Sequence, residues 1–454
     1  MERAFDVIVI GAGPAGEVCA GALGEAGLEV VIVERELVGG DCAYWACMPS
    51  KALLRPAEAL AEIGRIPGAA EAVTGVLDVA AALRRRDEVI HDFDDAGQLP
   101  WLKQRGVTLV RGEGRLVGER RVLVGDDVLV ARRAVVVATG SGAALPPVPG
   151  LVEARPWTSR EITTAKAAPA RLAILGGGVV AAEMAQAWSS LGSQVTVIQR
   201  GERLLNREEP FAAELVTQAL VARGVGVRTG TKLVRVDRSS DGVVIALGDG
   251  SEVVADEVVV ATGREPRTTT LGLESVGLDP GKSIDVDETL RVPGLPWIYA
   301  IGDVNGRTLL THMGKYQGRL VAETIQGRVS TLHPCADGLH SPRVVFTDPQ
   351  IAAVGHTLES ALAAGIAARA IDAETSGTAG GSFIGRGAAG TSRLVLDTDR
   401  RIIVGATFTG VEVAELLHAA TIIVVGAVPL DVLQHVVPSF PTRSEIWLRL
   451  LDQA

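Results

Sequence analysis

The sequence lacks the features that a membrane protein or a secreted protein needs. No stretch of its 454 residues reaches the ~18 consecutive apolar residues of a membrane-spanning helix. The first apolar run, residues 7–10, is not preceded by the basic segment of a secretory signal. The net charge of −10 argues against a nucleic-acid surface. We therefore expect a cytoplasmic protein that binds neither nucleic acid nor membrane.

Cysteine is also scarce, and two of the four cysteines lie close together. Cys42 and Cys47 follow Gly39 and Gly40. Residues five apart in a helix point ~140° apart, whereas a disulfide needs Cα atoms within ~7 Å. We therefore expect the pair where a loop enters a helix, with the glycines supplying unusual backbone. The spacing of Cys42 and Cys47 is compatible with a structural disulfide and with a redox-active pair. Structural disulfides are rare in the cytoplasm, which favours the redox-active pair.

A dinucleotide-binding pattern begins the chain. Residues 5–10 are predicted to form a buried strand, a helix should reach residue 26, and a second strand should span residues 29–33. The turn between the first strand and the helix supplies the candidate binding residues Gly11, Gly13, Pro14, Ala15 and Gly16. Such a turn lets a pyrophosphate approach the helix N-terminus. Glu34, 23 residues after Gly11, can bind ribose hydroxyls and disfavours a 2′-phosphate, so FAD or NAD fits better than NADP.

The same pattern occurs a second time. Strands are predicted at residues 172–175 and 194–198, with a helix through Glu183 to about residue 191 between them. The candidate nucleotide-binding residues here are Gly176, Gly178, Val179, Gln199 and Arg200. The acid of the first unit is replaced by Gln199, and a guanidinium follows, so NADPH is favoured over NADH. Two such sites imply two dinucleotides, one bound permanently and one used as a substrate.

Further strand ends add candidate cofactor contacts. A strand at residues 135–137 leads to Thr139 and Gly140, and a similar strand at 258–260 leads to Gly263. The strand beginning at residue 296 ends at Gly302 and Asp303, whose carboxylate could meet ribityl hydroxyls. Helices are predicted at 51–64, 76–105 and 310–327, and residues 341–454 read as an α+β domain. The predicted fold class is α/β, with two Rossmann-like (βαβ) domains and a C-terminal α+β domain.

Taken together, these motifs resemble the flavoprotein disulfide reductases, the class I pyridine nucleotide-disulfide oxidoreductases that include dihydrolipoamide dehydrogenase, glutathione reductase and mercuric reductase. The resemblance covers nearly the whole chain. It rests on both glycine-rich units and on residues 39–51, 261–266, 302–303, 346–352 and 441–445. It implies an FAD-binding domain at 1–148, an NAD(P)-binding domain at 149–265, a central segment at 266–338 that completes the FAD domain, and a homodimerisation domain at 339–454.

The resemblance also implies residue roles. FAD would lie on the first glycine-rich turn and Glu34, with Gly40, Thr139, Gly140, Gly302 and Asp303 nearby. Cys42 would be the interchange thiol that meets the substrate, and Cys47 the charge-transfer thiol against the flavin. Lys51 would lie near flavin N5 and pair with Glu183. NAD(P)H would serve as co-substrate, and no metal is expected.

One departure affects the chemistry. The family's C-terminal motif is His-Pro-Thr-x-x-Glu, in which the His moves protons and the Glu orients it. Here Phe440 replaces that His, while Glu445 is retained. General acid–base help is typically worth ~10²–10⁴-fold, so ordinary dithiol chemistry should be impaired. His435 is five residues upstream, where no motif places it for this role. Trp45, beside the cysteine pair, either shapes access for a flat acceptor or only packs.

Specific branches of the family can be weighed in the same way. Mercuric reductases need a C-terminal cysteine pair, and no cysteine follows Cys335 here, which argues against mercury reduction. The ketopropyl-coenzyme M carboxylase branch also has Phe at the His position, but it changes the Glu as well. This chain therefore matches that branch at Phe440 and differs from it at Glu445.

We therefore expect an FAD-dependent NAD(P)H oxidoreductase that reduces the Cys42–Cys47 disulfide and then a small disulfide or thiol substrate without the usual His. The alternatives are a reductase that passes electrons from flavin to a quinone or similar flat acceptor, and a carboxylase-like branch. A non-catalytic redox sensor is a third hypothesis, which the retention of both nucleotide sites and both cysteines argues against.

Overall fold

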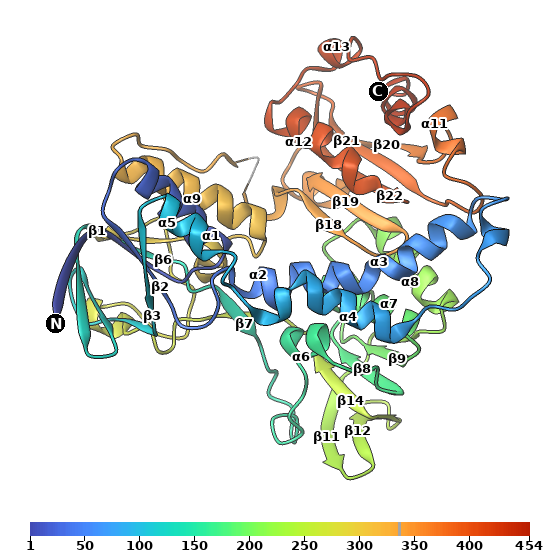
Figure 1. The fold of residues 1–454 in the computed structure, drawn as a ribbon. Coiled ribbons are helices and arrows are strands. Elements are labelled where there is room, and N and C mark those ends of the chain that lie inside the picture. The colour runs from blue at the N-terminus through green and yellow to red at the C-terminus, as the bar shows by residue number, and fades with distance from the viewer. Residues whose placement is uncertain (335–336) are drawn as a thin grey trace. The chain divides into compact units, whose positions relative to one another are not determined.

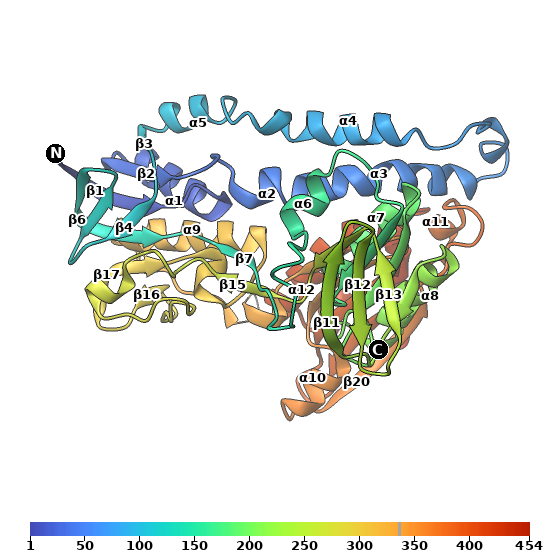
Figure 2. The same cartoon turned by 90° about the horizontal axis from the view of Figure 1, so that it is seen from below.

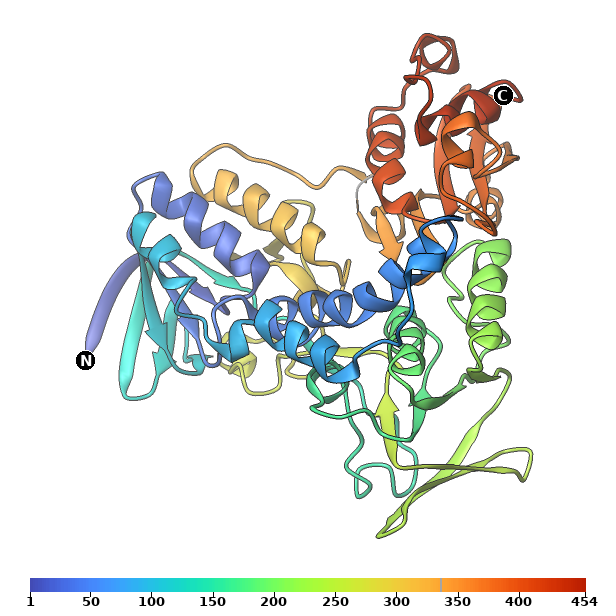
Figure 3. The same cartoon turned by 45° about the vertical axis from the view of Figure 1, so that its right-hand side comes forward.

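The computed structural model describes residues 1–334 and 337–454 (Figures 1, 2 and 3). Cys335 therefore lies outside the described residues. The chain forms two compact units. Unit 1 contains residues 1–49, 87–144 and 264–338, and unit 2 contains residues 50–86, 145–263 and 339–454. The two units are described separately below.

Unit 1 is built on a sheet whose main path runs β16-β17-β6-β1-β2-β3. These strands are β16 (Arg291–Val292), β17 (Leu295–Ala300), β6 (Asp127–Val137), β1 (Glu2–Ile10), β2 (Val30–Glu34) and β3 (Val107–Arg111). All neighbours along this path pair in parallel except β16 and β17. The antiparallel strands β4 (Gly114–Leu116) and β5 (Arg121–Val124) extend the sheet from β6. A separate pair joins β7 (Ser141–Ala143) to β15 (Arg264–Pro266).

Two helices of unit 1 pack tightly against each other. Helices α1 (Pro14–Glu25) and α9 (Thr311–Ile325) lie side by side, as Figure 1 shows. A Cβ on Gly318 would lie only 2.6 Å from the carbonyl oxygen of Ala15, so the close approach of the two helices requires glycine there. Buried aliphatic residues of both helices share one core with β1 and β2. The predicted strand at residues 5–10, the predicted helix that should reach residue 26 and the predicted helix at 310–327 all form, with bounds that differ by a few residues.

The helical segment that follows the cysteine pair is interrupted. Helices α2 (Gly40–Tyr44) and α3 (Cys47–Gly64) are followed by α4 (Val79–Val89) and α5 (Leu99–Gln104). The single helix expected at residues 76–105 is wrong, because residues 91–93 have positive φ angles of 51°, 48° and 64° and break it. Left-handed backbone of this kind cannot continue a right-handed helix.

Unit 2 contains the second glycine-rich unit. Its parallel sheet runs β10-β9-β8-β14, with β10 (Gly226–Arg228), β9 (Gln194–Ile198), β8 (Arg171–Leu175) and β14 (Glu257–Val260). Helices α6 (Ser159–Thr164), α7 (Val179–Ser190) and α8 (Pro210–Ala222) accompany it. Three antiparallel strands form a further sheet: β11 (Leu233–Ser239), β12 (Gly242–Leu247) and β13 (Glu252–Ala255). The predicted strand at residues 194–198 has the bounds of β9.

The C-terminal part of unit 2 is an antiparallel sheet with helices. Its order is β18-β19-β22-β21-β20, namely β18 (Arg343–Val345), β19 (Gln350–Gly355), β22 (Ile402–Gly410), β21 (Thr391–Asp397) and β20 (Ala368–Glu374). The helices are α10 (Leu358–Ala363), α11 (Ala379–Ser382), α12 (Leu417–Val425), α13 (Leu430–Leu433) and α14 (Ile446–Leu451). Aliphatic residues of α12 and α14 pack on β19, β21 and β22 to form one core.

Within residues 1–334 and 337–454, we find no helix whose length and apolar content would let it cross a bilayer.

Candidate active site

The first glycine-rich turn leaves space above the N-terminus of α1. A Cβ on Gly11 would lie 2.4 Å from the carbonyl oxygen of Ala138, and one on Gly16 would lie 2.0 Å from that of Gly11, so both positions require glycine. Gly13, the residue before α1, has no atom within 4 Å of such a Cβ. The turn is thus tightly packed at Gly11 and Gly16 and open at Gly13, next to the helix N-terminus. This arrangement fits a pyrophosphate bound at the helix N-terminus.

Glu34 is held in place by backbone groups. Its two carboxylate oxygens accept hydrogen bonds from the N–H groups of Ala12 and Glu36, each at 2.7 Å. The residue ends β2 and is buried. A buried carboxylate with one backbone donor on each oxygen retains free lone pairs, so it can accept ribose hydroxyls.

Thr139 and Asp303 also fit a polar cofactor. The Thr139 hydroxyl is buried and has no hydrogen-bond partner among the described residues, which is unusual unless a ligand completes it. Asp303 is the second residue of the single-turn helix that follows β17, and it accepts a 2.5 Å hydrogen bond from the Ser141 hydroxyl. Arg264 donates to the same hydroxyl at 2.6 Å and pairs with Asp41 at 3.3 Å. The residues present therefore fit FAD.

The cysteine pair lies across a break between two helices. Cys42 is in α2, which ends at Tyr44, and Cys47 is the first residue of α3. Gly39 and Gly40 have φ angles of 113° and 59°, so the expected left-handed backbone precedes the pair. Cys47 Sγ lies 3.3 Å from the Thr311 hydroxyl at the start of α9.

The surroundings of Cys42 favour its protonated form. Its hydrogen bond with Cys47, its burial and the charge of Cys47 raise the pKa of the Cys42 thiol well above the usual range. A hydrogen bond with Thr311 and the charge of Lys315 act in the opposite direction on this pKa.

Aromatic residues pack beside the pair. The rings of Tyr44 and Phe93 are stacked with centroids 6.4 Å apart, and Trp45 lies 5.8 Å from Phe93. The Tyr44 hydroxyl donates to the carbonyl of Val38 at 3.2 Å. Burial raises the pKa of the Tyr44 phenol to about 12, and the charge of Asp95 adds to the rise. Trp45 therefore packs on aromatic neighbours within unit 1.

The second glycine-rich turn repeats the geometry of the first. A Cβ on Gly176 would lie 2.3 Å from the carbonyl oxygen of Ala261, while Gly178, before α7, faces open space. The Gln199 side chain lies against Gly177, where a Cβ would be 2.9 Å from its Cδ. Arg200 is exposed. Val179 begins α7 and Gly263 follows β14, so the residues predicted for NAD(P)H surround one end of this sheet.

Lys51 and Glu183 form an ion pair within unit 2. Lys51 Nζ lies 2.7 Å from Glu183 Oε2 and 4.7 Å from the centroid of the Phe346 ring. The other Glu183 oxygen accepts the backbone N–H of Phe346 at 3.0 Å. Glu183 is only 3% exposed, so both of its carboxylate oxygens make their polar contacts in a buried environment.

The C-terminal motif has Phe440 at its first position and Glu445 at its last. The Phe440 side chain is 77% exposed. Glu445 accepts a 2.9 Å hydrogen bond from the backbone N–H of Gly380 in α11. A Cβ on Gly380 would lie 2.1 Å from the carbonyl carbon of Thr442, so α11 packs directly on this motif. His435 is exposed. Glu445 is thus held by the backbone of Gly380, although position 440 is Phe and not His.

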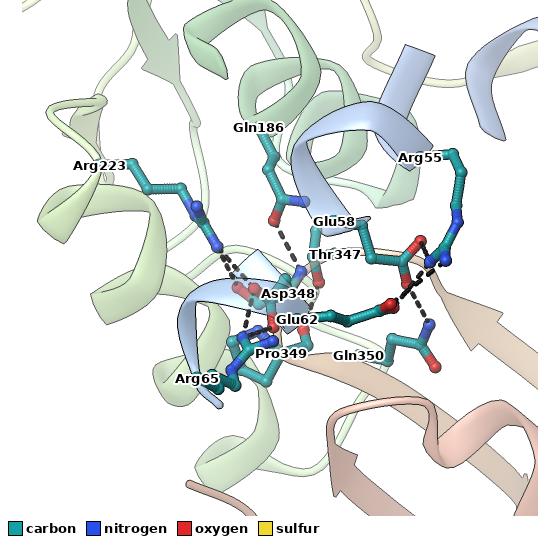
Figure 4. Close-up of polar contacts among 10 residues, drawn as sticks. All are labelled: Arg55, Glu58, Glu62, Arg65, Gln186, Arg223, Thr347, Asp348, Pro349 and Gln350. Atoms are coloured by element: carbon teal, nitrogen blue, oxygen red, sulfur yellow. Dashed lines mark hydrogen bonds and ion pairs between the residues drawn. The ribbon is translucent and has the colours of Figure 1, made fainter. Parts of the chain in front are cut away.

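A polar cluster in unit 2 is centred on Asp348, as Figure 4 shows. The Asp348 carboxylate is 8% exposed and pairs with Arg65 at 2.5 Å and with Arg223 at 3.0 Å. Its backbone N–H donates to the Gln186 side chain at 2.7 Å. Arg65 follows α3, Gln186 is in α7 and Arg223 follows α8, so one loop residue links three helices.

Sequence reasoning missed two residues that act on the cysteines, Thr311 and Lys315. Thr311 and Lys315 are one turn apart in α9, and they affect Cys42 only because the fold brings α9 to α2. Sequence reasoning also missed Glu17, whose burial raises the pKa of its carboxyl to about 7. It could have been noticed as the single acid in the otherwise small and apolar first turns of α1.

Comparisons with known proteins identify the family. Residues 5–318 match the model of the pyridine nucleotide-disulphide oxidoreductases, and residues 341–450 match the dimerisation domain of the same proteins. The chain therefore belongs to the pyridine nucleotide-disulphide oxidoreductase family, and the predicted family, fold class and type of enzyme are confirmed. Members of this family are FAD-dependent and use NAD(P)H.

Several relatives are similar over most of their length. A mercuric reductase of Staphylococcus aureus is 31% identical over 92% of this chain and 77% of its own. A dihydrolipoyl dehydrogenase of Chlamydia pneumoniae is 31% identical over 98% of this chain and 96% of its own. Among solved structures, the HOCl-induced flavoprotein disulfide reductase RclA of Escherichia coli has a TM-score of 0.87 at 22% identity, with 99% of each chain covered. LpdA of Mycobacterium tuberculosis has a TM-score of 0.86 at 24% identity, again with 99% of each chain covered. Both structures share the fold.

Proposed function

We propose that this enzyme passes electrons from NAD(P)H through FAD to the Cys42–Cys47 disulfide, and from there to a small disulfide or thiol-type substrate, without histidine as acid–base. The observation that carries the proposal is the thiol pair itself. The two thiols interact across the break between α2 and α3, and Cys47 contacts Thr311. A pair this close can form and break a disulfide without large movement of the backbone.

The residues proposed to hold FAD all belong to unit 1. They are Gly11, Gly13, Pro14, Ala15, Gly16, Glu34, Gly40, Thr139, Gly140, Gly302 and Asp303. When bound, FAD would supply the two-electron chemistry that links the nicotinamide to the cysteine pair. Lys51, one turn after Cys47 in α3, is proposed to lie near this cofactor, with its charge fixed by Glu183. The domain boundaries at residues 148, 265 and 338 are part of the same proposal.

The co-substrate is proposed to be NADPH, with NADH as the alternative. Gly176, Gly178, Val179 and Gly263 would approach the dinucleotide, and Gln199 with Arg200 would meet the adenosine ribose. An exposed guanidinium and a neutral amide suit a 2′-phosphate, which an acid would repel. Steady-state assays with both nucleotides test this choice, since a preference for NADH would contradict it.

The two cysteines are proposed to have different roles because they differ in protonation after reduction. When the disulfide is reduced, the S–S bond breaks, Cys42 takes a proton and Cys47 keeps the negative charge. This assignment is supported by the raised pKa of Cys42 and by the position of Cys47 at the N-terminus of α3, where a thiolate is stabilised. Cys42 is then the thiol that exchanges with substrate, and Cys47 reforms the disulfide by attacking the Cys42 sulfur.

Anaerobic reduction of the purified FAD enzyme tests the proposal. One equivalent of NADPH should convert Cys42 and Cys47 from resistant to alkylation to reactive, as counted by peptide mass spectrometry, and should produce a long-wavelength absorbance band. Cys47→Ser should lose the band. An enzyme whose thiols respond to dithiothreitol but not to NADPH would contradict the proposal.

A second function is supported by Phe440. Its exposed phenyl ring cannot move a proton, and reduction of a quinone or another flat acceptor directly from flavin would not need a proton carrier at that position. Cys42→Ala separates the two functions, because quinone turnover should survive this substitution and disulfide turnover should not.

The match of residues 341–450 to a dimerisation domain supports a homodimer formed through residues 339–454. Light scattering of the purified enzyme should give twice the mass of one chain.

A further inference from the structure

Helix α2, which carries Cys42, is too short to be held in place by its own hydrogen bonds. It has five residues, and isolated helices shorter than ~12–15 residues are marginal in water. Two glycines with positive φ angles precede Cys42, and the helix ends at Tyr44, before α3 begins at Cys47. The position of Cys42 therefore depends on contacts that α2 makes with other parts of unit 1.

Asp41, the residue before Cys42, makes such contacts. Its carboxylate lies 3.3 Å from the guanidinium of Arg264 and 3.3 Å from that of Arg267. All three side chains are partly buried. Because solvent screens partly buried charges less than exposed ones, these two ion pairs hold α2 more firmly than a pair at the open surface would.

The two arginines are themselves fixed to the fold. Arg264 is in β15, which pairs with β7, and the backbone N–H of Arg267 donates to the carbonyl of Gly140 at 3.0 Å. The Arg264 guanidinium also donates to the Ser141 hydroxyl at 2.6 Å and to the Ser141 carbonyl at 2.9 Å. Asp41 thus ties α2 to a part of unit 1 whose backbone is held by a strand pair.

The same contacts reach the residue proposed to meet FAD. The Ser141 hydroxyl donates to Asp303 at 2.5 Å, and Arg264 Nε lies 3.5 Å from the same Asp303 oxygen. A continuous chain of polar contacts therefore runs from Asp41, beside Cys42, to the candidate flavin site.

We propose that Asp41 is a positioning residue for the Cys42–Cys47 pair. Through its two arginine partners, it holds the short helix α2 where Cys42 can meet Cys47, so that the disulfide forms with little loss of conformational freedom. The proposal rests on the proposed function, in which this pair is oxidised and reduced in every cycle. It assigns Asp41 no part in the transfer of electrons or protons.

The proposal predicts how the stability of the disulfide depends on Asp41. In the oxidised enzyme, the S–S bond itself fixes α2 to the start of α3, so loss of the ion pairs changes little. In the reduced enzyme, α2 gains conformational freedom when the ion pairs are lost, and this freedom must be given up again when the disulfide forms. Loss of the ion pairs therefore favours the dithiol, and the disulfide becomes easier to reduce.

A direct effect of charge gives a different pattern. Without the Asp41 carboxylate, a nearby thiolate is less disfavoured, so the reduced pair is stabilised. Without the Arg267 guanidinium, a thiolate loses a favourable charge, so the reduced pair is destabilised. Removing the acid and removing the base should thus shift the equilibrium in the same direction if Asp41 acts by position, and in opposite directions if it acts by charge.

The test measures the redox equilibrium of the pair without NADPH. The purified FAD enzyme is equilibrated anaerobically at neutral pH with mixtures of reduced and oxidised dithiothreitol. Dithiothreitol gives two electrons and two protons to the disulfide: the enzyme S–S bond breaks, two thiols form, and dithiothreitol closes to its cyclic disulfide. Free thiols at Cys42 and Cys47 are then trapped with N-ethylmaleimide and counted by peptide mass spectrometry.

Asp41→Asn should shift this equilibrium toward the dithiol by about 3- to 10-fold, a rise of about 15–30 mV in a two-electron reduction potential. Arg267→Met should shift it in the same direction by about 2-fold or more. Asp41→Glu, which keeps the carboxylate, should stay closer to the original enzyme than Asp41→Asn. Arg115→Met and Glu274→Gln are the matched controls, because Arg115 and Glu274 of the same unit form an exposed ion pair at 2.9 Å and should leave the equilibrium unchanged.

An unchanged equilibrium in Asp41→Asn, or opposite shifts in Asp41→Asn and Arg267→Met, would overturn the proposal. If Asp41→Asn does not fold, Arg267→Met decides alone: a shift toward the dithiol supports the proposal, and no shift or a shift toward the disulfide overturns it. Since dithiothreitol replaces NADPH, failure of NADPH to reduce the pair would contradict the proposed function without altering this result.

Discussion

The Lys51 ammonium lies 2.7 Å from the carboxylate of Glu183, which is buried while Lys51 is 37% exposed. The exposed partner loses little when the pair is broken, whereas the buried carboxylate also accepts the backbone N–H of Phe346. The two residues are therefore unequal: Glu183 organises the pair, and Lys51 is the member that can face a ligand.

We predict that Glu183→Ala destabilises the protein by about 2–4 kcal/mol, because it leaves a buried N–H and an ammonium without their acceptor. Lys51→Ala should cost less, because Lys51 is partly solvated. Thermal unfolding of both variants checks the order. Equal losses of stability in the two variants would contradict the prediction, because they would show that buried Glu183 contributes no more to stability than the partly exposed Lys51.

Asp348 should be more sensitive than any surface carboxylate of the same domain. Asp348→Ala removes the partner of both Arg65 and Arg223 (Figure 4), and we predict a loss of about 3–5 kcal/mol in unfolding free energy. The matched control is Asp372→Ala, because Asp372 pairs with Arg393 but is 44% exposed. Denaturant unfolding measures both, and a similar small effect in the two would contradict the prediction.

How far the sequence predicts the structure depends on the range of the interactions involved. The strand at residues 194–198 is predicted with its bounds because a short buried strand between a helix and a turn is a local pattern. The glycines at 11, 16 and 176 are predicted for the same reason, since each fills a tight turn next to a strand end. The prediction of one helix at residues 76–105 is wrong because the backbone of His91, Asp92 and Phe93 is left-handed. None of these three residues is a glycine or a proline, so the sequence gives no sign of the break.

The site shows the same limit. Cys42 and Cys47 are visible in the sequence because they are close in it and cysteine is rare. Thr311 lies 264 positions beyond Cys47 and contacts it only after α9 has packed on α1. That packing depends on small residues such as Gly318, which no periodic pattern in the sequence singles out.

Glu17 predicts a pH dependence of stability. Because its pKa is raised in the folded protein from 4.5 to about 7, its contribution is present in full below pH 4.5 and is lost as the pH rises through 7. Glu17→Gln should therefore raise stability by about 1–3 kcal/mol at pH 8 relative to the original protein, with a much smaller difference at pH 5. Thermal unfolding at both pH values checks this. A gain of equal size at the two pH values would show that packing, not ionisation, is responsible.

Phe440→His tests whether the missing proton carrier limits the enzyme. Its side chain is exposed, so an imidazole fits without repacking, and Glu445 retains a second oxygen that can orient it while the first holds Gly380. We predict that disulfide-substrate turnover rises by about 10-fold or more and gains a pH dependence near the histidine pKa of ~6.5. Phe440→Asn is the matched control, because it is polar but does not titrate. If both variants behave alike, or if His gives no gain, then proton transfer at this position is not limiting.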